Sequence, residues 1–239
     1  MNKKDLEYLT IYDFLNKKRL GVNGDGGYVI GILDGEYDFY ISAGVSDEES
    51  FSRDFINMYK MNKQNCAAFD GTIKKYPYEY TNNITFYRRN ISPFKTDRTS
   101  NLSYFTDNYN DIFLKMDIEG HEFPWLNSLT EEQLNKFKQI VIEFHGIHDN
   151  SWDTNLSDKI DCFRKLSKTH YAIHIHGNNW DGITNRIPNV IEVTYIRKNV
   201  IDYSPLLNSQ RLPSKLDVPN NLGKPDYYLN FPPFVNSTF

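Results

Sequence analysis

The chain reads Asp111-Ile-Phe-Leu-Lys-Met-Asp-Ile-Glu-Gly-His-Glu122 near its centre, and this segment carries its clearest structural signal. The apolar run ends at Met116, and polar groups follow at once. Near-continuous apolar runs are typical of buried parallel strands, and ligands of open α/β sheets bind beyond the carboxyl ends of such strands. The segment therefore predicts a strand over residues 112–117 with a ligand site at its end. A strand followed by a solvated turn is the alternative.

Short apolar stretches alternate with amphipathic stretches along the rest of the chain. A glycine-rich turn from Gly21 runs into a strand that ends near Ile30, and further strands are predicted at 37–43, 65–70, 84–88, 139–145, 170–176 and 190–197. Helices are predicted at 3–19, 46–61, 130–138 and 156–167. Capping boxes at Ser46/Glu49 and Thr130/Gln133 mark the starts of two of them. This alternation predicts a parallel sheet built from βαβ units.

Length, charge and composition narrow the class of protein. The 239 residues suit one large α/β domain, with a polar loop at 94–110 and an irregular tail at 199–239 packed on the core. The net charge of −4 argues against a nucleic-acid partner, which usually needs a basic face. Two cysteines suggest neither a disulfide framework nor a zinc cluster. The N-terminus lacks an apolar signal core, and no run reaches transmembrane length, so we expect a cytoplasmic protein without a membrane partner.

Two features predict a nucleoside site. Gly44 precedes a capped helix, and the amides at a helix N-terminus suit a carboxylate or phosphate. The pattern is neither a dinucleotide fingerprint nor a P-loop. Asp70 lies 26 residues further on, at the end of the next strand, and an acidic residue near that distance binds ribose hydroxyls in related folds. Ordinary connecting turns are the alternative.

Two pairs of polar residues end neighbouring predicted strands. Asp117 and Glu119 point the same way in an extended chain, and so do Glu143 and His145. If the strands are neighbours, these groups converge. Three interpretations stay open: a Mg²⁺ or Mn²⁺ site formed by Asp117, Glu143 and His145, an acid/base or substrate-contact site with His145 as general base, or a buried structural network.

A further candidate site follows the predicted strand 170–176. His174 and His176 share one face of that strand, and Gly177-Asn-Asn-Trp180 comes next. Trp180 can stack on a sugar or another polyhydroxy ligand, while the amides of Asn178 and Asn179 offer hydrogen bonds. An ordinary Asn-rich loop is the alternative.

Several motifs, taken together, resemble one family. Residues 114–122 (Leu-Lys-Met-Asp-Ile-Glu-Gly-His-Glu) resemble the fourth-strand signature of FkbM-type S-adenosylmethionine-dependent methyltransferases. The other similar segments, in the same order as in that family, are 25–29 (Asp-Gly-Gly-Tyr-Val), 42–51 (Ser-Ala-Gly-Val-Ser-Asp-Glu-Glu-Ser-Phe), 69–72 (Phe-Asp-Gly-Thr), 142–145 (Ile-Glu-Phe-His) and 190–195 (Val-Ile-Glu-Val-Thr-Tyr). The resemblance covers residues 20–198, after a helical extension at 1–20.

The resemblance implies a fold and a set of binding residues. The fold is a Rossmann-like class I methyltransferase sheet of seven strands, the last antiparallel, with helices on both faces. The residues that would bind the cofactor are Asp25, Gly26, Ser42, Gly44, Ser46, Asp70, Asn90, Ile91 and Asp117. The polar strand ends and the loop described above, rather than the resemblance, supply the residues that would bind the substrate: Glu119, His121, His176, Asn178 and Trp180. The first glycine turn, at Gly44, departs from the common form by having one glycine where two or three are usual.

The hypothesis is an enzyme of the EC 2.1.1 class that methylates oxygen on a small or glycan-linked hydroxyl, most simply a sugar. Asp117 and His145 would be its catalytic residues, with Mg²⁺ or Mn²⁺ as an optional cofactor. The alternatives are a catalytically silent binding module and a methyltransferase for another acceptor, through N-methylation or on nucleic acid. An NAD(P)-dependent reductase fits less well because its glycine fingerprint is missing. A homo-oligomer stays open.

Overall fold

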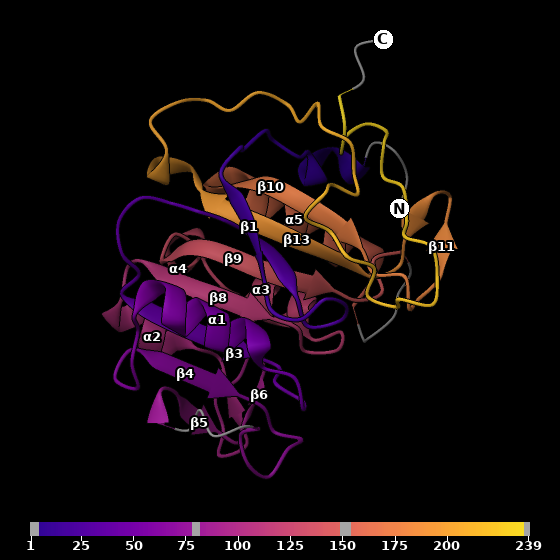
Figure 1. Cartoon of the computed structure of the whole chain (residues 1–239). Helices are drawn as coiled ribbons and strands as arrows, with labels where there is room; N and C mark the ends of the chain where they lie inside the picture. The colour runs from indigo at the N-terminus through magenta and orange to yellow at the C-terminus, as the bar shows by residue number, and fades with distance from the viewer. Residues whose placement is uncertain (1–4, 78–81, 149–153, 237–239) are drawn as a thin grey trace.

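A seven-stranded mixed sheet forms the centre of the protein in a computed structural model that describes residues 5–77, 82–148 and 154–236 (Figure 1). From one edge to the other the strands are β10 (His170–Gly177), β13 (Ile191–Arg197), β9 (Phe137–Phe144), β8 (Ile112–Met116), β3 (Phe39–Ala43), β4 (Cys66–Phe69) and β5 (Thr85–Tyr87). The strands from β9 to β5 pair in parallel, whereas β13 is antiparallel to both β9 and β10. The predicted Rossmann-like methyltransferase sheet with an antiparallel last strand is confirmed.

The two faces of the sheet are covered differently. One face packs against helix α1 (Ser50–Tyr59) and the hairpin of β1 (Lys17–Leu20) and β2 (Tyr28–Gly31), both drawn in front of the sheet in Figure 1. The other face packs against α2 (Ser103–Asn108), α3 (Glu122–Ser128), α4 (Glu131–Leu134) and α5 (Leu156–Thr169). Successive strand residues point to opposite faces. Phe113 therefore meets Phe55 of α1, with ring centroids 4.1 Å apart, whereas Leu114 joins the opposite core.

One predicted helix and the start of another are wrong. The predicted helix at 3–19, whose first two residues lie outside the described ranges, is a 3-10 helix at Asp5–Leu9 followed by strand β1. Leu15 is 81% exposed, so the apolar stripe expected of that helix does not form. The capping box at Ser46 and Glu49 is also absent: α1 begins at Ser50, and Ser46 has a φ of 51°. Pairing with β2 in the first case and contacts with β4 in the second override these local signals.

Two corrections concern the middle of the chain. The predicted loop at 94–110 contains strand β7 (Thr99–Ser100), paired with β6 (Asn90–Ile91), and helix α2. Helix α3, directly after the Asp117 segment, was not predicted. The capping box at Thr130 and Gln133 is confirmed, with hydrogen bonds of 3.1 and 3.0 Å, although α4 ends at Leu134.

The segment after the 3-10 helix η3 (Lys198–Val200) has no regular helix as far as residue 236 and packs on the core; residues 237–239 lie outside the described part. Its side chains Leu212, Leu229 and Phe234 are buried in the same core as α3 and α5. A small hairpin of β11 (Ile183–Thr184) and β12 (Ile187–Pro188) lies in the connection before β13. Among the described residues, no helix is both long and apolar enough to cross a bilayer. The hairpin and the segment after η3 thus both add buried side chains to the core.

Candidate active site

A cavity of about 720 Å³ opens at the carboxyl ends of β3, β4 and β8. Its volume lies within the range of small-molecule sites. The predicted site residues that line it are Asp25, Gly26, Gly44, Ser46, Asp70, Asn90, Ile91, Asp117, Glu119 and His121. The other predicted site residues lie outside its lining: Ser42, Glu143, His145, His176, Asn178 and Trp180.

The Gly44 turn is held in place from two sides. Gly44 has a φ of 80°, and a Cβ atom there would lie 1.5 Å from the carbonyl oxygen of Asp117. Lys115 donates from Nζ to the Gly44 carbonyl at 2.7 Å. Asp70 accepts hydrogen bonds from the amides of Val45 and Ser46 at 3.0 and 2.9 Å. Only glycine allows the turn to approach β8 this closely.

Both carboxylate oxygens of Asp70 accept hydrogen bonds from the chain itself. Its second oxygen accepts hydrogen bonds from the amide and the hydroxyl of Thr72, at 2.7 and 2.6 Å. Burial raises the pKa of Asp70, but the hydrogen bonds outweigh it and leave the pKa below its usual value. A ribose would share oxygens that already fix the turn, so Asp70 both lines the cavity and shapes it.

Ser42 was predicted to face the cofactor, but the structure places it beneath the turn. Its hydroxyl donates to Glu49 at 3.0 Å, and Tyr76 donates to the other Glu49 oxygen at 2.8 Å. Ser42 is fully buried, and burial raises the pKa of Glu49. The pair therefore supports the Gly44 turn from inside the core.

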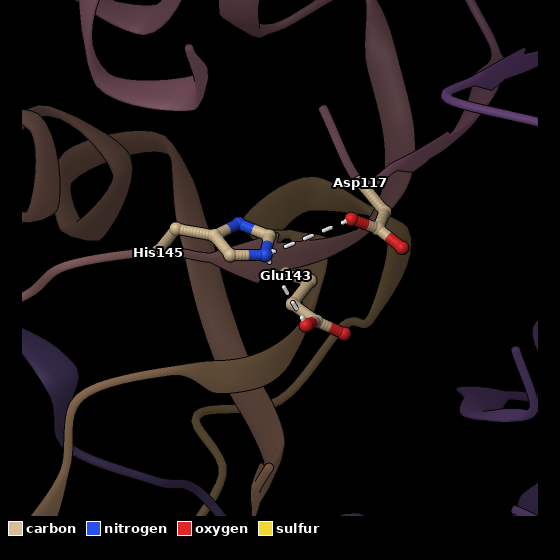
Figure 2. A group of neighbouring side chains, drawn as sticks. All are labelled: Asp117, Glu143 and His145. Atoms are coloured by element: carbon tan, nitrogen blue, oxygen red, sulfur yellow. Dashed lines mark ion pairs between the residues drawn. The ribbon is translucent and has the colours of Figure 1, made fainter. Parts of the chain in front are cut away.

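Asp117, Glu143 and His145 meet at the ends of β8 and β9, as Figure 2 shows. His145 Nε2 lies 3.9 Å from an Asp117 oxygen and 3.5 Å from a Glu143 oxygen. Glu119 contributes a third carboxylate at 3.6 Å, on a largely exposed side chain. One ligand atom from each of Asp117, Glu143 and His145 lies within 4.8 Å of the others, a grouping that a divalent cation can bridge.

Glu122 orients the imidazole from behind. It is fully buried, and its Oε1 lies 3.1 Å from His145 Nδ1. The same oxygen accepts hydrogen bonds from the amides of Ile118 and Gly120, at 3.0 and 3.2 Å. Burial opposes the charge of His145, but Glu122, followed by Asp117, raises its pKa to about 9. At neutral pH both ring nitrogens of His145 therefore carry a proton, and the imidazolium is positively charged.

Glu122→Gln is expected to lower the pKa of His145 by about one unit or more, because the amide cannot match the attraction of a carboxylate for the imidazolium. The measurement is a pH titration of the imidazole signals by NMR. Glu131→Gln is the matched control, since Glu131 lies exposed on α4, where it forms an ion pair with Lys168. An unchanged pKa in the Glu122 variant would show that the other carboxylates alone hold the proton.

The residues predicted to bind a sugar are split between core and surface. His176 is buried between Glu192 at 3.1 Å and Asp226 at 3.0 Å; burial opposes its charge, but these partners raise its pKa to about 10. Asn178 is buried and donates to Glu143 at 2.9 Å. Trp180 is 57% exposed. Asn178 thus supports the cluster, and Trp180 is an exposed ring with Lys224 Nζ over it, 5.7 Å from the ring centroid.

The polar residues around the site that sequence reasoning missed include Tyr28, Lys115, Glu192 and Asn220. Tyr28 donates to the second Asp117 oxygen at 3.1 Å. Asn220 links Asp25 and Glu192, with hydrogen bonds of 3.1 and 2.6 Å. Lys115 gave the one local signal, as a charge inside an apolar run.

The model of the FkbM methyltransferase domain matches residues 15–176. Because this match covers more than half of the chain, and the sheet has the order described above, the chain belongs to the FkbM methyltransferase family. The search of curated proteins gave no match.

Proposed function

We propose that the protein is an S-adenosylmethionine-dependent O-methyltransferase that acts on a small or glycan-linked hydroxyl, most simply that of a sugar. The observation that carries the proposal is the cavity at the ends of three parallel strands, which places the Gly44 turn and Asp117 together. In open α/β sheets this edge is where ligands bind.

The chemistry of the cavity fits the cofactor from end to end. Phe69, Ile91 and the amide of Asn90 suit a nucleobase. At the other end, Asp25 and Asp117 suit the positive charges of a sulfonium and an ammonium. The cofactor supplies a methyl group on a positively charged sulfur.

The chain must orient the acceptor hydroxyl and take its proton. Holding the acceptor oxygen in line with the methyl group is mainly a matter of positioning. Asp117 lines the cavity, and His145 lies behind it within ion-pair distance, so either can receive the proton. With a pKa of about 9, His145 is a positively charged imidazolium at neutral pH. A cationic ligand beside it lowers its pKa and prepares it to act as a base.

A divalent cation at Asp117, Glu143 and His145 is the second proposal for this cluster. Glu122 binds His145 Nδ1, which leaves Nε2 directed at the two carboxylates. A carboxylate behind a histidine in this way is typical of metal sites. Mg²⁺ or Mn²⁺ there would acidify the acceptor hydroxyl.

Titration calorimetry with S-adenosylhomocysteine, with and without Mg²⁺, tests both proposals. We expect micromolar binding, corresponding to about −8 kcal/mol. Tighter binding with Mg²⁺, lost in Glu143→Gln, would support the metal site. Absence of binding in either condition would refute the cofactor assignment. Binding without turnover on any acceptor would favour a silent module.

The exposed ring of Trp180 beside Asn178 supports a carbohydrate acceptor, because aromatic rings stack on sugar faces. The acidic composition supports a small acceptor over nucleic acid. Transfer of label to sugar hydroxyls, compared with transfer to amines and RNA, separates these acceptors.

A further inference from the structure

Carboxylates continue across the sheet beyond Asp117. Glu192 on β13 pairs directly with Glu143 on β9. Met116 pairs with Ile142, so Asp117 and Glu143 are the next residues of their adjacent parallel strands. We call these three carboxylates, Asp117, Glu143 and Glu192, the acidic row, and we include Asp25, which Asn220 links to Glu192. Like charges directly opposite in a sheet destabilise it, and two histidines offset part of this charge: His145 lies 3.5 Å from Glu143, and His176 lies 3.1 Å from Glu192.

The partners within the chain leave the acidic row incompletely satisfied. Both oxygens of Glu192 are bonded, to Asn220 at 2.6 Å and to His176 at 3.1 Å. Glu143 Oε1 accepts from Asn178, but its buried Oε2 has no hydrogen-bond partner. The buried Oδ1 of Asn220 has none either. Glu143 and Asn220 are 3% and 5% exposed, so both atoms are buried without a donor from the described part of the chain.

The Asn220 oxygen is a hydrogen-bond acceptor, and so is the Glu143 oxygen when that carboxyl is ionised. A ligand group that satisfies both oxygens must therefore be a hydrogen-bond donor. A protonated amine carries three donors, no acceptor and a positive charge. Resting on the function proposed above, which assigns Asp25 and Asp117 to the cofactor, we propose that the other end of the acidic row, Glu143 and Glu192, binds a protonated amine of the acceptor. The substrate would then be an amino sugar or a similar amino alcohol. The amine fixes the acceptor while a neighbouring hydroxyl receives the methyl group.

The position of Glu192 favours the acceptor as the source of this amine over the cofactor. The Gly44 turn lies on β3, on one side of β8, whereas β9 and β13 lie on the other side. Adjacent strands are about 4.8 Å apart, so Glu192 is about 10 Å from Asp117 across the sheet. On the cofactor side, Lys115 is bonded to the Gly44 carbonyl.

The test is transfer of labelled methyl from S-adenosylmethionine at pH 7 to paired sugars: glucosamine, galactosamine and mannosamine against their N-acetyl forms. We expect kcat/KM to be about tenfold or more higher for at least one free amine, since acetylation removes the charge. Glu192→Gln should reduce this preference, whereas Glu131→Gln on α4 should keep it. S-adenosylhomocysteine binding checks that each variant has an intact cofactor site.

Each other result overturns the inference. Equal or better transfer to the N-acetyl sugars would show that the acidic row does not select an amine. Transfer that depends only on Mg²⁺ would assign the row to a metal. No transfer to either series by protein that binds S-adenosylhomocysteine would refute the amino-sugar acceptor and leave the cofactor assignment standing. Failure to bind S-adenosylhomocysteine would instead refute the proposed function itself.

Discussion

Gly44→Ala is expected to abolish cofactor binding and to lower the free energy of unfolding by about 3 kcal/mol. The added methyl group would lie 1.5 Å from the backbone oxygen of Asp117, which cannot move without displacing β8. The φ of 80° adds strain for any residue with a Cβ. Urea denaturation and S-adenosylhomocysteine titration measure the two effects.

Gly182→Ala is the matched control for this variant. A Cβ at Gly182 meets nothing within 4 Å. Its stability should stay within about 0.5 kcal/mol of the parent protein. If Gly44→Ala behaved like this control, the turn would have to accommodate a side chain, and its close approach to β8 would play no part in shaping the cavity.

His145→Ala is expected to reduce turnover by about 10²- to 10⁴-fold while the affinity for S-adenosylhomocysteine stays near that of the parent protein. The imidazole lies within 3.9 Å of an Asp117 oxygen, and it lies outside the cavity lining. Single-turnover kinetics and calorimetry separate the two readouts. His148→Ala is the control, because His148 bonds the carbonyl of Ile187 at 2.8 Å, away from the cluster.

The pH dependence provides a second check on His145. Its pKa of about 9 means that the base form increases as the pH rises toward that value. The kcat/KM of the parent protein should therefore rise up to about pH 9 and then level off. This rise of kcat/KM with pH should be absent in His145→Ala. A variant with full activity, or a flat profile in the parent protein, would remove His145 from proton transfer.

The central site could be predicted because it depends on neighbouring parallel strands. The apolar run before Asp117 and the run before Glu143 each predict a strand, and β8 and β9 are adjacent. Parallel strands present their carboxyl ends at one edge. Convergence of Asp117, Glu143 and His145 therefore follows from local patterns plus a single pairing.

The parts that could not be predicted depend on contacts between distant segments. The Ser46 capping box loses to Asp70, which binds the Val45 and Ser46 amides from the next strand. Helix α3, which was not predicted, is short and carries Pro124 in its first turn, where a helix tolerates proline. Asn220 reaches Asp25 across 195 residues, and no local pattern contains such a contact.

The position of Asn220 separates two properties of the molecule along its sequence. The cavity lining runs from Asp25 to His121, inside the part of the chain that the family shares. Glu192 and Asn220 lie after residue 176, where the family match ends. With the two sides assigned as proposed above, a lineage can change the proposed acceptor side through its last segments and leave the proposed methyl-donor pocket intact.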